Sequence, residues 1–264
     1  MRVVDLDRDM RDVIPTGTTR DSEFLFARMT GETLAAARPG PGKRVLDVAS
    51  GLGQDAAALA ERGAITIAAE PSSRMSELAR LSVSQQGGVL THWVRSWSDM
   101  LPFADDRFDA VICKGALDHF DRPSAAIAEI ARVTKPAGTA VLAIANFDSL
   151  SCRVGRALDV AREGWFRRPT PAGRRGYDVP HDHFTRYELP LMREQAERSL
   201  VLDHVVGVSL GWGLPKWAQL LESLPEGAAQ TLLSGLDWLA ARAPSLADVV
   251  ILAGRPRQRA TTSA

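Results

Sequence analysis

The segment of residues 45–70, VLDVASGLGQDAAALAERGAITIAAE, constrains the fold more than any other part of the chain. It begins with a short apolar run interrupted by Asp47, which is typical of a parallel strand covered on both faces. Gly51 and Gly53 follow, where the backbone must turn tightly and approach a ligand closely. The alanine-rich residues 54–62 predict a helix, and a second strand follows it. This order predicts part of a doubly wound α/β sheet.

Acidic residues lie at the carboxyl ends of both predicted strands, where a parallel sheet opens its ligand crevice. Asp47 is near the end of the first strand, and Glu70 closes the second. A carboxylate such as Glu70 offers two acceptor oxygens and can accept both hydroxyls of a ribose. The first amides of the helix after Gly53 should point at whatever lies over the glycines. The pattern therefore predicts a nucleoside-cofactor site.

The glycine turn alone does not decide which nucleoside binds. Residues 51–56 also satisfy the loose dinucleotide pattern G-x-G-x-x-G/A, which leaves a nicotinamide oxidoreductase open. Asp47, however, would repel a pyrophosphate. S-adenosylmethionine brings a sulfonium and an ammonium group, which suit Asp47, and a carboxylate, which suits the helix amides. Charge therefore favours S-adenosylmethionine as the cofactor.

Three further motifs follow in order along the chain. They are EPSSRMSELAR at 70–80, LPFADDRFDAVICKGALDHFDRP at 101–123 and AIAEIARVTKPAGTAVLAIAN at 126–146. With these motifs, residues 44–146 resemble the class I S-adenosylmethionine-dependent methyltransferases, in the branch that acts mostly on small molecules. The resemblance implies an α/β fold with a doubly wound, seven-stranded, Rossmann-like sheet. Its last strand would be antiparallel, and helical lid insertions would flank the site.

The expected organisation is a single methyltransferase domain over residues 1–264, with residues 44–146 as the cofactor-binding core. The resemblance implies that residues 1–43 form a helical lid over the cofactor. Residues 147–188 and 209–245 break the strand–helix alternation, and segments this long are usually functional. We expect both to be substrate-side elaborations, the second with two short helices.

The resemblance also places the cofactor on named positions. Ala49 stands where the family often has glycine, and its carbonyl stays available for the methionyl ammonium. Lys114 follows the fourth strand, where a backbone carbonyl would meet the methionyl end. The expected cofactor-binding set is Asp47, Ala49, Gly51, Gly53, Glu70, Pro71, Trp97, Ser98, Asp99 and Lys114.

The adenine contact departs from the family pattern. The family usually has an aspartate four residues before the leucine of LPF, and that position here is Trp97. Either Asp99 reaches the adenine amino group through a shifted turn, or Trp97 stacks on the ring and the amide of Ser98 adds polar recognition. We favour Trp97 and Ser98, with Asp99 near them. The alternative is that Trp97 packs on the sheet edge.

Two histidines are candidates for catalysis. His119 follows the fourth strand and is a candidate general base because it is a histidine, although a turn-packing role is the alternative. His183, in PHDHFTRYEL, is expected at the substrate mouth as a base or hydrogen-bond donor, or as a structural loop residue. His181 and His183 together suggest a metal, but His-x-His alone lacks a third ligand at a recognisable spacing. We therefore expect no metal ion.

Composition restricts the partners. The 32 basic and 32 acidic side chains cancel, so no global field favours nucleic acid or an anionic membrane. Two cysteines suggest no disulfide framework and fit a reducing compartment. The first residues lack an apolar signal core, and no run approaches about 18 apolar residues. We expect a cytoplasmic monomer or homodimer with a small-molecule substrate and neither nucleic acid nor membrane as partner.

The expected activity is methyl transfer from S-adenosylmethionine to an oxygen, nitrogen or carbon nucleophile of a small organic molecule, with secondary metabolites among the candidates. A second hypothesis is an enzyme that binds the cofactor without methylating, such as a cyclase or decarboxylase. Methylation of RNA or protein is disfavoured by the balanced charge and by the lack of an Asn-Pro-Pro-Tyr-like motif after the fourth strand.

Overall fold

The computed structural model describes residues 19–85, 92–165, 167, 175, 177–180 and 183–258. Its helices are α1 (Arg20–Ala37), α2 (Gln54–Glu61), α3 (Ser73–Gln85), the 3₁₀ turn η2 (Leu117–His119), α4 (Pro123–Val133), α5 (Leu150–Gly164), α6 (Leu189–Glu197), α7 (Trp217–Ser223) and α8 (Glu226–Arg242). Its strands are β1 (Arg44–Val48), β2 (Ile65–Ala69), β3 (His92–Val94), β4 (Phe108–Lys114), β5 (Thr134–Ala145), β6 (Leu200–Val208) and β7 (Val249–Pro256).

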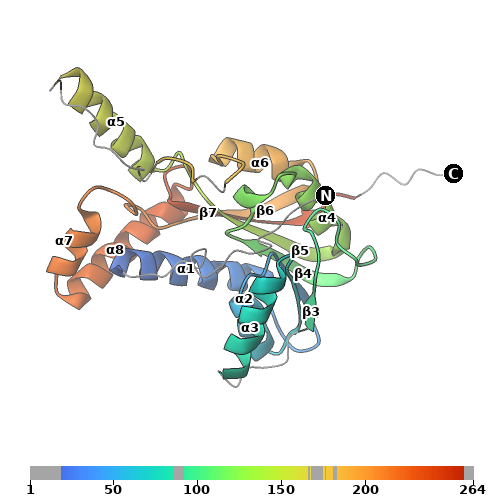
Figure 1. Cartoon of the computed structure of the whole chain (residues 1–264). Helices are drawn as coiled ribbons and strands as arrows, with labels where there is room; N and C mark the ends of the chain where they lie inside the picture. The colour runs from blue at the N-terminus through green and yellow to red at the C-terminus, as the bar shows by residue number, and fades with distance from the viewer. Residues whose placement is uncertain are drawn as a thin grey trace.

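The strands form one seven-stranded sheet in the order β3-β2-β1-β4-β5-β7-β6 (Figure 1). β1 pairs in parallel with β2 and β4, whereas β7 is antiparallel to both β5 and β6. The predicted doubly wound, seven-stranded sheet with an antiparallel last strand is confirmed. The strand order reverses between β1 and β4, and their carboxyl ends form the crevice where such sheets bind ligands.

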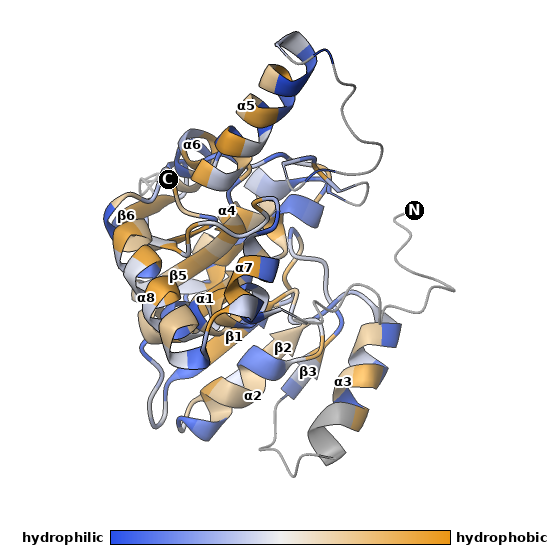
Figure 2. Ribbon diagram, turned by 90° about the vertical axis from the view of Figure 1, so that its left-hand side faces the viewer, coloured by the Kyte–Doolittle hydropathy of each residue, from blue (hydrophilic) through white to orange (hydrophobic). Residues whose placement is uncertain are grey.

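Helices cover both faces of the sheet. Figure 1 shows α1, α2 and α3 on one side and α4 and α6 on the other. Alternate residues of β4 enter two separate cores: Val111 and Cys113 pack on the α4 side, and Ala110 and Ile112 pack on the side of α1 and α2. Figure 2 shows the apolar strands lying between these layers. In β1 the same alternation places Asp47 on the α2 side, between its register partners Ala68 of β2 and Ile112 of β4.

The described part of the segment before β1 is one long helix. α1 buries Leu25, Met29 and Leu34 in the core on its side of the sheet. Its Arg28 forms an ion pair with Asp237 of α8 at 2.7 Å. α1 is thus part of the packed core, and residues 1–18 of the expected lid lie outside the described residues.

The two elaborations differ in shape. Figures 1 and 2 show α5 projecting away from the sheet, whereas α7 and α8 pack near α1. Two helices were expected in the second elaboration, and α7 has 7 residues. α8 has 17 residues and is not short, because Ala229, Leu233 and Ala240 continue one buried face along it. None of the described helices is long and apolar enough to cross a membrane.

Candidate active site

The loop after β1 is held in left-handed backbone conformations. The φ angle is 56° at Ala49, 53° at Gly51 and 71° at Gly53. A Cβ on Gly51 would meet only Cε of Met75, at 3.5 Å, so this glycine is needed for its backbone. A Cβ on Gly53 would lie 2.2 Å from Cη2 of Trp93, so here a side chain is also excluded. Gly53 therefore lets the first turn of α2 pack directly on the indole of β3.

Glu70 lies at the tip of β2 beside this turn and is only 7% exposed. Its Oε2 accepts the amide of Gly51 and its Oε1 accepts the amide of Ser72, both at 3.0 Å. A carboxylate oxygen can accept more than one hydrogen bond. The neighbouring Pro71 is partly exposed, and its carbonyl accepts a hydrogen bond from Arg95. This geometry suits the predicted ribose contact, which stays a prediction.

Three acids and one lysine gather at the crevice: Asp47, Asp55, Glu70 and Lys114. Within the described residues, Oδ2 of Asp47 is buried with no hydrogen-bond partner. Burial, followed by the charges of Asp55 and Glu70, raises the pKa of Asp47 well above its usual value, while Lys114 acts in the opposite direction. An orphaned carboxylate oxygen among further acids fits the cationic groups of S-adenosylmethionine.

Lys114 has a side-chain role that the sequence did not indicate. Its Nζ donates to Asp55 Oδ1 at 2.9 Å and to Thr30 Oγ1 at 2.6 Å. It therefore ties the end of β4 to α2 and to α1. The signal for Asp55 was available in the sequence, because an acid in the first helical turn is favoured by the helix dipole.

The loop after β3 carries the predicted adenine residues. Trp97 and Ser98 are half-buried, whereas the carboxylate of Asp99 is buried and pairs with Arg122 at 3.4 Å. This ion pair holds Asp99 toward the start of α4. Trp97 and Ser98 are thus the more accessible pair in the loop, and their contact with adenine remains a prediction.

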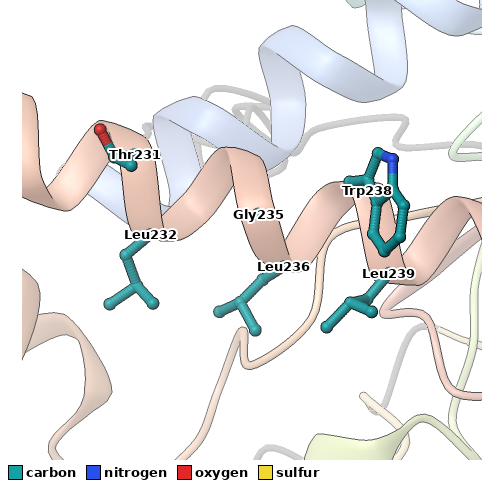
Figure 3. Close-up of a pocket in the computed structure, with 6 residues that line it drawn as sticks. All are labelled: Thr231, Leu232, Gly235, Leu236, Trp238 and Leu239. Atoms are coloured by element: carbon teal, nitrogen blue, oxygen red, sulfur yellow. The ribbon is translucent and has the colours of Figure 1, made fainter.

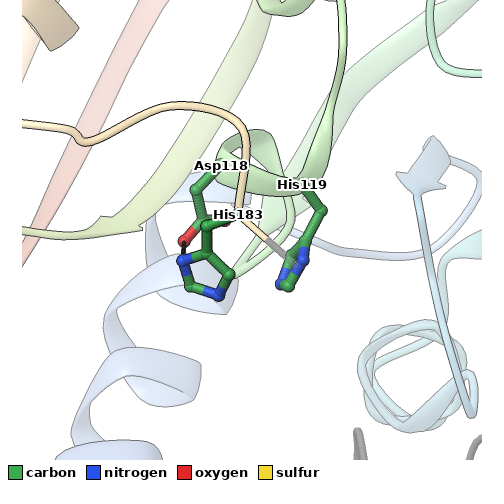
Figure 4. Close-up of side chains that lie close together, drawn as sticks. All are labelled: Asp118, His119 and His183. Atoms are coloured by element: carbon green, nitrogen blue, oxygen red, sulfur yellow. Dashed lines mark ion pairs between the residues drawn. The ribbon is translucent and has the colours of Figure 1, made fainter. Parts of the chain in front are cut away.

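A second polar group follows β4 and contains both predicted catalytic histidines (Figure 4). Asp118 and His119 belong to η2, and His183 comes from the loop before α6. Nδ1 of His183 lies 3.1 Å from Oδ2 of Asp118. The rings of His119 and His183 meet edge to face, with centroids 4.3 Å apart. We call Asp118, His119 and His183 the imidazole cluster.

The two segments of the imidazole cluster are fixed to each other by the main chain. The amides of Phe184 and Thr185 donate to the carbonyl of Asp118 at 2.7 and 3.2 Å. The Asp118 and His183 side chains are 5% and 14% exposed. The sequence did not indicate Asp118, because nothing in its local sequence distinguishes it from an ordinary acidic residue in a turn. His181, the other histidine of the His-x-His pattern, lies outside the described residues.

An open hollow of about 440 Å³ lies along α8. Its lining residues, which include Leu232, Trp238 and Leu239, are drawn in Figure 3, and none of them is titratable. A second cavity of about 260 Å³ lies at the base of α5 and is lined by residues of both elaborations, including Asp159 and Trp212. The second cavity therefore matches the expected substrate side better than the first.

The sheet order, the glycine turn after β1 and the acid at the tip of β2 together define a class I S-adenosylmethionine-binding fold. Residues 46–142 match the family model described as a methyltransferase domain. This part of the chain is similar to the methyltransferase domain of the class I S-adenosylmethionine-dependent methyltransferases, and the match supports S-adenosylmethionine as the cofactor.

Individual relatives support this assignment. Demethylmenaquinone methyltransferase from Clavibacter sepedonicus is 35% identical over 147 residues, which are 56% of this chain and 51% of that protein. The chain thus spans about half the length of the curated relatives it matches.

Two solved structures share the fold. YcgJ from Bacillus subtilis has a TM-score of 0.56 at 18% identity and covers 89% of this chain and 100% of its own. The [4+2]-cyclase SpnF has a TM-score of 0.57 at 20% identity and covers 86% and 80%. At these identities the likeness shows the fold alone.

Proposed function

We propose that this chain transfers a methyl group from S-adenosylmethionine to an oxygen, nitrogen or carbon nucleophile of a small organic molecule. The observation that carries the proposal is the position of two polar groups at the carboxyl end of β4. Asp47, whose buried Oδ2 has no hydrogen-bond partner among the described residues, pairs in register with Ile112, and the imidazole cluster begins in the turn after this strand. Burial raises the pKa of the Cys113 thiol, and the charges of Asp47 and Asp118 raise it further. The Cys113 thiol is therefore expected to stay protonated beside these acids. A cofactor-side acid and an acceptor-side base would meet across the end of this strand.

The nature of the acceptor is supported by charge and by relatives. Several curated relatives are named demethylmenaquinone methyltransferases, which act on a small molecule. The 32 basic and 32 acidic side chains provide no excess positive charge for RNA. We also propose that the protein is cytoplasmic and is a monomer or homodimer.

In this proposal the bound cofactor supplies a methyl group already activated by its sulfonium. Glu70 binds the ribose, Asp47 faces the positive charge, and the amides at the start of α2 bind the carboxylate. Positioning of this kind can be worth effective molarities of roughly 10⁵–10⁸ M, whereas a general base adds about 10²–10⁴-fold. His183, oriented by Asp118 and flanked by His119, takes the proton of the acceptor.

The test is label transfer from S-adenosylmethionine to compounds of a metabolite extract by the purified protein. His183→Ala should lower kcat by about 10²–10⁴-fold and leave the cofactor Kd unchanged. His204→Ala is the matched control, because His204 lies exposed on β6. Full activity in His183→Ala would assign this residue to structure.

Two other outcomes decide between the proposed function and its alternatives. Turnover without release of S-adenosylhomocysteine would establish the cyclase or decarboxylase alternative. Binding of NADH and not of S-adenosylmethionine in calorimetry would overturn the proposal.

A further inference from the structure

The imidazole cluster has the composition of a metal site. One ligand atom from each of Asp118, His119 and His183 lies within 4.8 Å of the other two. Within the described ranges, this is the only group of three such residues that could hold a metal ion. The sequence offered only His-x-His, and the fold adds Asp118 and His119 from a different segment.

The distances are close to those of a bound ion. A metal about 2.1 Å from each ligand places neighbouring ligand atoms about 3.0–3.4 Å apart. The distance of 3.1 Å between His183 Nδ1 and Asp118 Oδ2 falls within this range of ligand–ligand distances. The rings of His119 and His183, with centroids 4.3 Å apart, are in contact, so both imidazoles lie within reach of one ion. The ligand atoms farthest from each other, at most 4.8 Å apart, would have to approach by about 1.4 Å to reach this spacing.

The surroundings of the cluster favour a ligand with positive charge. The second oxygen of Asp118, Oδ1, is buried with no hydrogen-bond partner among the described residues. The ring of Phe147 stands edge-on to His183, 6.0 Å away, and limits access of water from that side. The backbone bonds from Phe184 and Thr185 to Asp118 hold the ligands together before any ion arrives. A bound cation stabilises a buried carboxylate oxygen that has no hydrogen-bond donor.

We propose that Asp118, His119 and His183 bind a divalent transition-metal ion of the Zn²⁺ or Co²⁺ type. Two imidazoles and one carboxylate select such ions over Mg²⁺ and Ca²⁺, which prefer oxygen ligands alone. Three protein ligands leave a coordination position open. The functional consequence rests on the proposed function: an ion that takes the lone pair of His183 removes the base, so Zn²⁺ inhibits methyl transfer.

The experiment is a titration of the untagged full-length protein with Co²⁺, followed by its visible d–d absorption, with Zn²⁺ as competitor. We expect one Co²⁺ per chain, displacement by Zn²⁺ and no displacement by Mg²⁺. Asp118→Asn and His183→Ala should each weaken binding by about 100-fold or more, because each removes one of three ligands. His204→Ala should bind as the wild type does. His119→Gln serves as a further ligand variant if Asp118→Asn fails to fold.

Absence of the absorption in the wild type, or its persistence at full affinity in the ligand variants, would overturn the metal site. These results leave the methyl-transfer proposal intact, since that is measured by label transfer without added metal. Conversely, Co²⁺ binding with increased methyl transfer would keep the metal site and refute His183 as the base.

Discussion

Replacing Gly53 by alanine tests the packing of the glycine turn on Trp93. The φ angle of 71° costs an alanine about 1–2 kcal/mol, because its Cβ approaches the following carbonyl. The new Cβ would also lie 2.2 Å from Cη2 and 2.6 Å from Cζ2 of the Trp93 ring. Forcing atoms into a packed core typically costs about 1–3 kcal/mol. We therefore expect Gly53→Ala to lower the free energy of unfolding by about 2–5 kcal/mol in urea denaturation followed by circular dichroism.

Gly51→Ala is the matched control for this prediction. Its φ of 53° carries a similar backbone cost, but its Cβ would meet Met75 only at 3.5 Å, an ordinary contact. We expect about 1–2 kcal/mol here, and the difference between the two variants measures the indole contact. A double-mutant cycle with Trp93→Leu should show a coupling energy of about 1–3 kcal/mol, because the smaller side chain relieves the overlap. Equal destabilisation by both glycine variants, or no coupling to Trp93, would refute the proposed packing.

Three further predictions concern buried carboxylates. Glu70→Gln should weaken binding of S-adenosylmethionine by about 1–3 kcal/mol in calorimetry, since the ribose loses a charged acceptor; an unchanged Kd would contradict the ribose contact. Binding should tighten as pH rises through the raised pKa of Asp47, because the cation favours the carboxylate. Calorimetry of cofactor binding in buffers of different ionisation enthalpy should then detect proton release by the wild type and none by Asp47→Asn. Equal proton release by the wild type and the variant would exclude Asp47 as the source of the proton. Burial raises the pKa of Asp248 from 3.8 to about 7, so the folded state holds an extra proton between these values. Stability should therefore fall from about pH 4 to pH 7, by up to about 4 kcal/mol, with a flatter profile in Asp248→Asn; parallel profiles would exclude Asp248 as the cause.

The fold was predictable because the strand and helix patterns are local. The apolar run around Asp47 and the alanine-rich helix after Gly53 determine the first βαβ unit, and both are present as predicted. The length of α8 was not predictable in this way, since its buried face depends on packing against α7 and β6. The packing of α1 in the core was not predictable either. It depends on the face of the sheet that α1 covers, and this face exists only once the strands have assembled.

The candidate site likewise contains residues that the local sequence predicts and residues that it does not. Glu70 could be placed at a strand tip from the sequence, and the structure fixes it there through the amides of Gly51 and Ser72. The contact between Asp118 and His183 could not, because it joins two distant segments across the end of β4. The His-x-His pattern directed attention to His181, the neighbour in sequence, although the spatial partners of His183 come from η2. Local patterns thus predict the proposed cofactor side, and long-range packing brings together the residues of the proposed acceptor side.

The distribution of charge explains why a loose glycine pattern need not indicate a dinucleotide. Asp47 lies near the further acids Asp55 and Glu70 and near the ammonium of Lys114, which forms an ion pair with Asp55. At about 5 Å and an effective dielectric constant near 20, each contact between unit charges is worth about 3 kcal/mol. A pyrophosphate beside these acids would be repelled and would keep Asp47 protonated. A sulfonium and an ammonium would instead be attracted to these acids, by an energy of similar size, and would stabilise the Asp47 carboxylate. Because both ligands could use the same glycine turn, the acids around it determine which of them binds.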